Sequence, residues 1–274
     1  MVAIIWITGL LAVVSLSTVI AVRSQTLRTR NAVSAELAQG VADGLLRREA
    51  LTWAVGSSGE TRRPARGQWS SCQWDGGATA WISVQDQAGL AGLNTATPNI
   101  VLMLLEGLVH ARPQALALQQ AMADFRDEDK LTPSGEPEPS RYPGRSFGPK
   151  NQAFAAVEEL DQIPGFTDEV RARLSALTTV YSQQQGILAS AAPPELLRLL
   201  YEASPAPGTS LGAQSSGAYA IVVAVALKDG SRFVRRAVIE VTGQPQRPFA
   251  IDVWSRAAWP PDLPAAAGGA RCLD

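Results

Sequence analysis

The chain has 274 residues, with 24 Lys and Arg against 25 Asp and Glu, one His and two Cys. The formal charge of -1 argues against binding to phosphate backbones through a general basic excess. A single histidine and two cysteines argue against histidine-based triads, multi-histidine metal sites, four-cysteine zinc sites and a dense disulfide framework. The length is sufficient for one large domain with a real core.

Residues 1–22 form an apolar stretch without a charged side chain. At 1.5 Å per residue, a helix of this length spans about 33 Å, which matches the hydrocarbon core of a bilayer. A cleaved secretory signal is the alternative interpretation. The apolar run is longer than the usual signal core and has no basic residues before it, so we expect a membrane-spanning helix.

The orientation of this helix is open from the span alone. Arg23, Arg28 and Arg30 directly follow it. The positive-inside rule, taken alone, would keep that side in the cytoplasm. A basic leader removed by processing would reverse the orientation, so the rest of the chain has to decide.

The helical pattern continues beyond the membrane. No proline occurs between residues 23 and 54, and small or apolar side chains recur about every four residues, at Val33, Leu37, Ala38, Val41, Ala42 and Leu45. This spacing predicts one apolar stripe along a helix. The Gly and Ser residues at 56–59 predict where the helix ends. We therefore expect one long helix with a membrane half, 1–22, and an amphipathic half, 23–56, that packs on a soluble domain.

Strand patterns then appear in two groups that lie far apart in the sequence. The first group covers 68–74 and 78–85, and the second covers 218–227, 232–241 and 249–254. Asp-Gly turn signals separate neighbouring strands in each group. The pattern predicts an α+β fold in which the long N-terminal helix packs on an antiparallel sheet. The sheet's first part would be 57–85 and its second part, with the tail, 211–274, with a large all-helical insertion domain at 86–210.

The expected insertion contains an internal echo. Residues 93–105 align with 188–200, and both segments place a small or hydroxyl residue before a proline that is followed by leucines. A proline at this position favours the first turn of a helix. We interpret the echo as a duplicated helical element, and two unrelated helix starts with common caps are the alternative.

A pattern that resembles a helix–hairpin–helix lies between the two copies, in residues 153–177. The turn is centred on Pro164 and Gly165, and Thr167 is placed to cap the second helix. Such hairpins can hold a DNA phosphate when basic side chains are near. Residues 151–177 instead contain five acids against two arginines, a local charge of -3. We expect a packing role, and a membrane-anchored helix–hairpin–helix DNA-binding protein is the alternative function.

Acidic side chains cluster at the end of a predicted helix, and the following loop adds more: Asp124, Asp127, Glu128, Asp129, Glu136 and Glu138. Acids at a helix C-terminus oppose the helix dipole unless a cation compensates them. Carboxylates and loop carbonyls are the ligands that calcium takes in proteins. No EF-hand spacing is present. A solvated acidic turn paired with Arg126 and Lys130 is therefore the alternative to a calcium site.

Taken in order, these segments resemble a known family. The pilin-type N-terminal helix is followed by LNTATPNIVLMLL, DFRDEDKL, PKNQAFAAVEELDQIPGF and VYSQQQGILASAAPPELL. They are similar to the minor pseudopilin K family of the type II secretion system, over most of the chain. DFRDEDKL and the IPGF block at their spacing are the most specific parts. At Ala189 and Ser190 the chain departs from the Asn-Thr expected in the second echo.

The resemblance implies an α+β pseudopilin fold with a helical insertion that contains calcium. It implies assembly with minor pseudopilins I, J and H, and no nucleic-acid or small-molecule partner. The place of action would be the pseudopilus tip, where the protein would promote pseudopilus assembly and export of folded proteins. A single-pass inner-membrane anchor would hold the soluble domain in the periplasm.

The resemblance also implies that the prepilin peptidase removes a basic cytoplasmic leader, which makes Met1 the first mature residue. The membrane anchor and filament core would then begin with Met1, Ile4, Ile5 and Trp6. Most pilins carry a glutamate at the fifth mature position, where this chain has Ile5. That glutamate pairs with the terminal amine of a neighbour in the apolar filament core, where an unpaired charge is costly. A subunit without it can stand at the tip, where the neighbour is absent.

A periplasmic location implies an oxidising compartment, which favours a disulfide between Cys72 and Cys272. An envelope hydrolase lacks support, because no G-x-S-x-G motif is present and His110 is the one histidine that a serine could use. His110 follows a leucine-rich segment and is placed to end a helix. We therefore expect a structural assembly protein and no enzyme.

Overall fold

The structure is a computed structural model, and it describes residues 1–55, 65–132, 135–137, 142, 148–203, 211, 214–266 and 271–272. Within the first helix, the side chains of Ile5, Thr8, Ala12 and Val14 are outside this description. The Gly and Ser residues at 56–59, expected to end that helix, and Glu138 of the acidic loop also lie outside the described residues.

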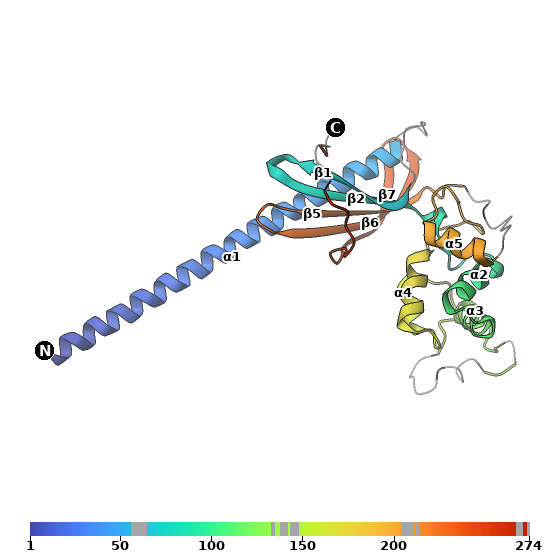
Figure 1. The fold of residues 1–274 in the computed structure, drawn as a ribbon, viewed down its shortest axis with the longest axis horizontal. Coiled ribbons are helices and arrows are strands. Elements are labelled where there is room, and N and C mark those ends of the chain that lie inside the picture. Colours follow the sequence, from blue (N-terminus) through green and yellow to red (C-terminus); the bar gives the residue numbers. More distant parts are fainter. Residues whose placement is uncertain are drawn as a thin grey trace.

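One helix, α1 (Val2–Val55), forms a rod that projects far beyond the rest of the molecule (Figure 1). Its first 37 residues are almost entirely exposed, and its apolar N-terminal window is long enough to cross a membrane. Burial begins at Ala38 and continues through Val41, Ala42, Leu45, Leu46 and Ala50. The helix therefore has a free half and a half that packs on the sheet.

The position of the apolar stripe differs from the sequence prediction at its start. Val33 is 63% exposed and Leu37 is 57% exposed, so neither packs on the sheet. The reason is the reach of the sheet, whose contact with α1 begins near Ala38, four residues after Ser34 beside the β5–β6 turn. Leu46 and Ala50, which the prediction did not include, take the corresponding places further along the helix.

The sheet has five antiparallel strands in the order β1-β2-β5-β6-β7. The bounds are β1 (Arg66–Trp74), β2 (Ala78–Asp86), β5 (Ala218–Ala226), β6 (Arg232–Gln244) and β7 (Arg247–Arg256). β2 pairs directly with β5, from Thr79–Ala226 to Asp86–Tyr219. Two strands that are neighbours in space are thus separated in sequence by the insertion. This confirms the predicted α+β fold with an interrupted sheet.

The face of the sheet toward α1 forms the first core. Tyr219, Ile221, Val223 and Val225 alternate along β5 and pack with the buried residues of α1. An ion pair crosses this interface between described residues, because Nε of Arg235 on β6 donates to Oδ1 of Asp43 on α1 at 2.6 Å. The Arg235 guanidinium also lies 5.1 Å from the centre of the Trp254 ring. The interface therefore combines apolar packing with specific polar contacts.

The C-terminal segment is tied to the sheet at two places. The Trp81 indole donates to the Pro264 carbonyl at 2.9 Å, and the rings of Trp81 and Trp259 meet edge to face with centroids 5.9 Å apart. Further along, Cys272 is bonded to Cys72 of β1, with the two residues 200 positions apart in the sequence. The Cys272 amide also donates to the Gln73 carbonyl at 3.0 Å.

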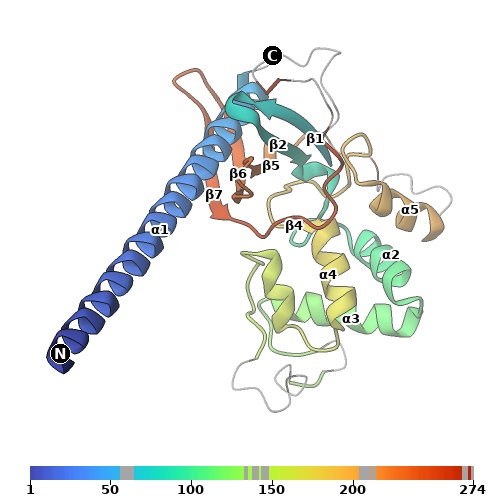
Figure 2. The same cartoon turned by 60° about the vertical axis from the view of Figure 1, so that its left-hand side comes forward.

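The insertion runs from the end of β2 to the start of β5 and has its own core. Its elements are η2 (Gln87–Gly89), β3 (Ala91–Gly92), α2 (Pro98–Val109), α3 (Arg112–Arg126), η4 (Val157–Gln162), α4 (Asp168–Leu177), β4 (Thr178–Thr179) and α5 (Pro194–Ala203). The parallel bridge between β3 and β4 departs from the all-helical expectation. Turning the molecule shows the insertion beside the sheet, without contact to the free half of α1 (Figure 2).

The two echoed segments become the helices α2 and α5, which pack against each other. α2 begins at Pro98 as predicted, whereas α5 begins at Pro194, one residue after the aligned proline. The close approach depends on Gly107, because a Cβ there would lie 2.6 Å from a methyl carbon of Leu199. Leu104, Leu105, Leu199 and Leu200 of these helices are fully buried.

Candidate functional site

The N-terminal anchor is the first candidate surface. Met1, Ile4 and Trp6 are exposed at the free end of α1, and Trp6 keeps 76% of its surface accessible. Ile5 lies within the same helix, and its side chain is outside the description. In this part of the chain, exposed apolar side chains continue on every side of the helix to Val22. A helix that is apolar all round suits a bilayer or a bundle of similar helices.

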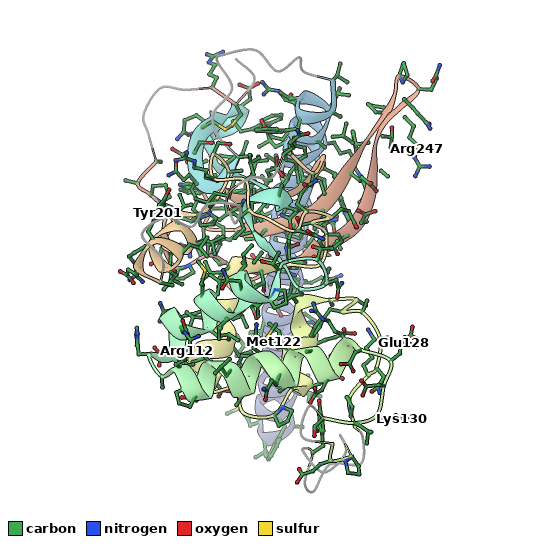
Figure 3. The ribbon with its side chains drawn as sticks, turned by 90° about the vertical axis from the view of Figure 1, so that its right-hand side faces the viewer. Arg112, Met122, Glu128, Lys130, Tyr201 and Arg247 are labelled. Carbon is green, nitrogen blue, oxygen red and sulfur yellow. A yellow bond between two sulfur atoms is a disulfide. The ribbon has the colours of Figure 1, made fainter. Side chains whose placement is uncertain are left out.

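The acidic residues lie at the C-terminal end of α3 and in the segment that follows it. Asp124 is 3% exposed, and Asp127, the residue that ends the helix, is half-buried. Glu128, Asp129 and Glu136 are exposed. Glu128 and Lys130 lie at the C-terminal end of α3, opposite Arg112 at the start of the helix (Figure 3).

The charged form of Asp127 is disfavoured by its surroundings in this group. Burial and the neighbouring Asp129 carboxylate raise the pKa of Asp127, while the Arg126 guanidinium opposes the rise. Its Oδ1 atom is buried and accepts no hydrogen bond in the described part of the chain. The Oδ2 atom of Asp124 is also buried. A buried carboxylate oxygen without a donor favours a nearby cation.

The other members have different local roles. Oδ1 of Asp129 accepts from the Leu131 amide at 2.8 Å, and the Asn151 side-chain amide donates to the Asp129 carbonyl. Glu136 is held at its backbone, where its carbonyl accepts from the Thr132 amide at 2.8 Å. These contacts shape the loop but do not direct its carboxylates inward.

The acidic residues predicted as metal ligands, Asp124, Asp127, Glu128, Asp129 and Glu136, therefore do not form one cluster. Among the residues that the structure describes, no three His, Cys, Asp or Glu side chains gather closely enough to hold a metal ion. Asp127 fits a cation through its buried oxygen, and Asp129 contributes charge nearby. Calcium takes six to eight oxygens in proteins, which is more than these two carboxylates supply.

The predicted helix–hairpin–helix segment, 153–177, packs in the insertion core and does not present a phosphate site. Its first element is the 3₁₀ helix η4, and Leu160 and Ile163 are buried in the insertion core. Thr167 caps α4 as predicted, accepting from the Val170 amide at 3.2 Å. Its two arginines have acidic partners, because Arg171 pairs with Asp161 and Asp168, and Arg173 pairs with Glu195. Lys150, directly before the segment, pairs with Glu159. No described basic side chain of this segment is left over for a phosphate.

His110 ends α2, as the sequence predicts. It has a left-handed backbone with a φ of 55°, and its amide donates to the Glu106 carbonyl at 2.9 Å. The residue is exposed. This is the geometry of a helix C-terminal cap.

The sequence did not predict the hydrogen bonds that connect the sheet to the insertion. Asp86 at the end of β2 is 4% exposed and accepts hydrogen bonds from the Ala88 amide and from the hydroxyls of Ser215 and Ser216. Gln85 donates to the Ala191 carbonyl at 2.9 Å, and Arg66 donates to the Ser190 carbonyl at 2.6 Å. These hydrogen bonds connect the sheet to the insertion where the chain leaves β2 and where it returns to β5. In the sequence, the one sign of this contact is an acidic residue, Asp86, between a strand pattern and a loop pattern.

Comparison with known proteins agrees with the fold and with the insertion. Residues 83–183 match a family model described as "Type II secretion system (T2SS), protein K". This confirms the resemblance to the minor pseudopilin K family through the segment that holds DFRDEDKL and the IPGF block. A search of curated protein sequences gives no significant match.

A solved structure is similar over most of the chain. It is a chain from the crystal structure of the GspK–GspI–GspJ complex of the type 2 secretion system of enterotoxigenic Escherichia coli. The TM-score is 0.57 at 16% sequence identity, and the likeness covers 86% of this chain and 99% of that chain. At this identity the likeness shows a shared fold.

Proposed function

We propose that this chain, which matches protein K of the type II secretion system across residues 83–183, is a minor pseudopilin that caps the tip of the pseudopilus. It would be anchored in the bacterial inner membrane by the N-terminal half of α1, with the soluble domain in the periplasm. In this place it promotes assembly of the pseudopilus and thereby export of folded proteins across the outer membrane.

The position of the insertion is the observation that carries this proposal. Along the longest dimension of the molecule, the insertion lies at the opposite end from the N-terminus, beyond the sheet and the C-terminal end of α1 (Figure 1). Pilin-like subunits stack with their long helices side by side in the filament core. A large domain at the end of the molecule opposite the N-terminus obstructs the addition of a further subunit there. The chain is therefore suited to the last position in a filament.

The composition of α1 supports the same place. No acidic residue occurs before Glu36, so the helix has no carboxylate that needs the amine of a neighbour in an apolar core. The helix can therefore occupy a position where one neighbour is missing. Its exposed apolar half would pack on the helices of the subunits below.

The partners that we propose are the minor pseudopilins I and J, with H joining them. The similar solved chain comes from a complex with proteins named GspI and GspJ, and the shared fold makes the same type of assembly available to this chain. We also propose that the insertion holds a calcium ion near the acidic end of α3, where the buried oxygen of Asp127 favours a cation. The ion would supply positive charge that fixes the loop and would take no part in a reaction.

Copurification tests the proposal. The full chain, tagged and expressed with the I and J subunits of its own system in mild detergent with calcium, is expected to elute as a stable complex. The major pseudopilin, tagged in the same way, is the control. If the chain elutes without I and J while the control behaves normally, the proposal is wrong. Tight, salt-sensitive retention of DNA by the full chain would favour the helix–hairpin–helix alternative instead.

A further inference from the structure

Three arginines form a group on α1 immediately beyond the apolar span. Arg23, Arg28 and Arg30 are the only charged side chains before Glu36. All three are exposed, and none of them forms an ion pair within the described residues. We call these three residues the arginine collar. Four other arginines of the described chain, Arg112, Arg171, Arg173 and Arg198, have acidic partners in the insertion.

The sheet does not cover the part of α1 that carries these arginines, because burial of α1 begins at Ala38. A hollow of about 700 Å³ lies along α1 from Val22 to Ser34, and the turn between β5 and β6 lines it at the Ser34 end. Among the residues that line the hollow, Asp229 of that turn is acidic, and hydrogen bonds from the Ser34 hydroxyl and the Ser231 amide lower its pKa. The hollow is lined by Arg30 and by both polar and apolar side chains.

The helix geometry sets the depth of the collar. If residues 1–22 fill the hydrocarbon core, Arg23 lies about 1.5 Å beyond it and Arg30 about 12 Å beyond it. The headgroup layer occupies roughly the first 5–8 Å on each side of the core. All three guanidinium groups can therefore reach lipid phosphates, or lie within about one Debye length of them.

We propose that the arginine collar binds the phosphates of anionic phospholipids, of which phosphatidylglycerol is the simplest, in the membrane leaflet that faces the soluble domain. The inference rests on the membrane anchoring in the proposed function and adds the lipid class that this part of α1 selects. Guanidinium groups form paired, charge-assisted hydrogen bonds to phosphate oxygens. The hollow beside Leu27 leaves room for a lipid headgroup next to Arg30.

Lipid binding by the full chain in detergent tests the proposal. Fluorescent phosphatidylglycerol and phosphatidylcholine are titrated separately onto wild type and onto the triple variant R23Q/R28Q/R30Q. The matched control is R112Q/R198Q/R247Q, which removes three exposed arginines far from the membrane, including Arg247 at the tip of the β6–β7 hairpin (Figure 3). Inorganic phosphate is added as a competitor in a further arm. Circular dichroism checks that each variant keeps its fold.

Wild type and the control variant are expected to prefer phosphatidylglycerol over phosphatidylcholine, and the collar variant is expected to lose about tenfold or more in that preference. Raised salt is expected to reduce the preference. Equal binding of both lipids by wild type, or an unchanged preference in the collar variant, overturns the proposal. Displacement of the lipid by millimolar inorganic phosphate also overturns it, because the site would then be a free-anion site. A complex with the I and J subunits that forms despite such a result leaves the proposed function standing.

Discussion

The ion pair between Asp43 and Arg235 is the sharpest test of how α1 is attached to the sheet. Nε of Arg235 is 2.6 Å from Oδ1 of Asp43, and Nη2 is 3.4 Å from Oδ2. The two side chains are only 10% and 16% exposed. Asp43→Asn removes the charge but retains an acceptor and leaves the guanidinium desolvated. Breaking a fully buried pair costs about 3–5 kcal/mol. The cost is lower here because the two side chains keep some exposure and the amide oxygen that the substitution introduces still accepts a hydrogen bond. We therefore expect Asp43→Asn to lower the free energy of unfolding by about 2 kcal/mol.

Thermal unfolding of the full chain in detergent, followed by circular dichroism, measures this loss. For a protein of this size, about 2 kcal/mol corresponds to a fall in Tm of roughly 4–8 °C. Glu202→Gln breaks a control pair, because Arg198 and Glu202 are 53% and 55% exposed, and should cost less than about 1 kcal/mol. The double variant D43N/R235M should recover part of the loss, since the unpaired cation is gone. Equal effects of D43N and E202Q would refute the reasoning.

Three further predictions concern the tail, the insertion core and the metal. Replacing Cys72 and Cys272 by Ser should lower the free energy of unfolding by about 2–5 kcal/mol, because the bond closes a 200-residue separation; non-reducing peptide mass spectrometry that finds free thiols in wild type would contradict it. Leu104→Ala should cost about 2–5 kcal/mol in chemical denaturation, whereas Leu116→Ala, on the exposed side of α3, should cost under about 1 kcal/mol. EDTA should lower the Tm of wild type, while Asp127→Asn should remove that response without lowering the Tm in EDTA; an unchanged wild-type Tm would exclude the metal.

Local patterns were sufficient for the elements of the fold. Strands rich in Val, Ile and aromatic residues appear in the structure within a few residues of their predicted bounds, and Asp-Gly turns connect β1 to β2 and β5 to β6. Pro98 and Thr167 begin their helices where the chain chemistry places them, and His110 ends one. These features depend on backbone preferences and on hydrogen bonds between near neighbours. Such interactions are encoded over a few residues, so a single sequence reveals them.

Sequence spacing was insufficient for the acidic site. Asp124, Asp127, Glu128 and Asp129 are close in the chain, but successive positions on a helix and its end point in different directions. Asp124 turns into the core, Asp129 is used by its own loop, and Glu128 faces solvent. The close spacing of acidic residues in the sequence therefore indicated a local negative charge. It did not predict which carboxylate oxygens point toward a common site.

The sequence by itself determined the long helix with its uncharged half, the strands, and the insertion between β2 and β5. Only the tertiary structure decided where the apolar stripe of α1 begins, because the end of the sheet, and not the helix pattern, sets whether Val33 and Leu37 are covered. It also decided that Asp43 meets Arg235 and that Asp86 joins the sheet to the insertion. These contacts join residues more than a hundred positions apart, and no local preference encodes such a distance.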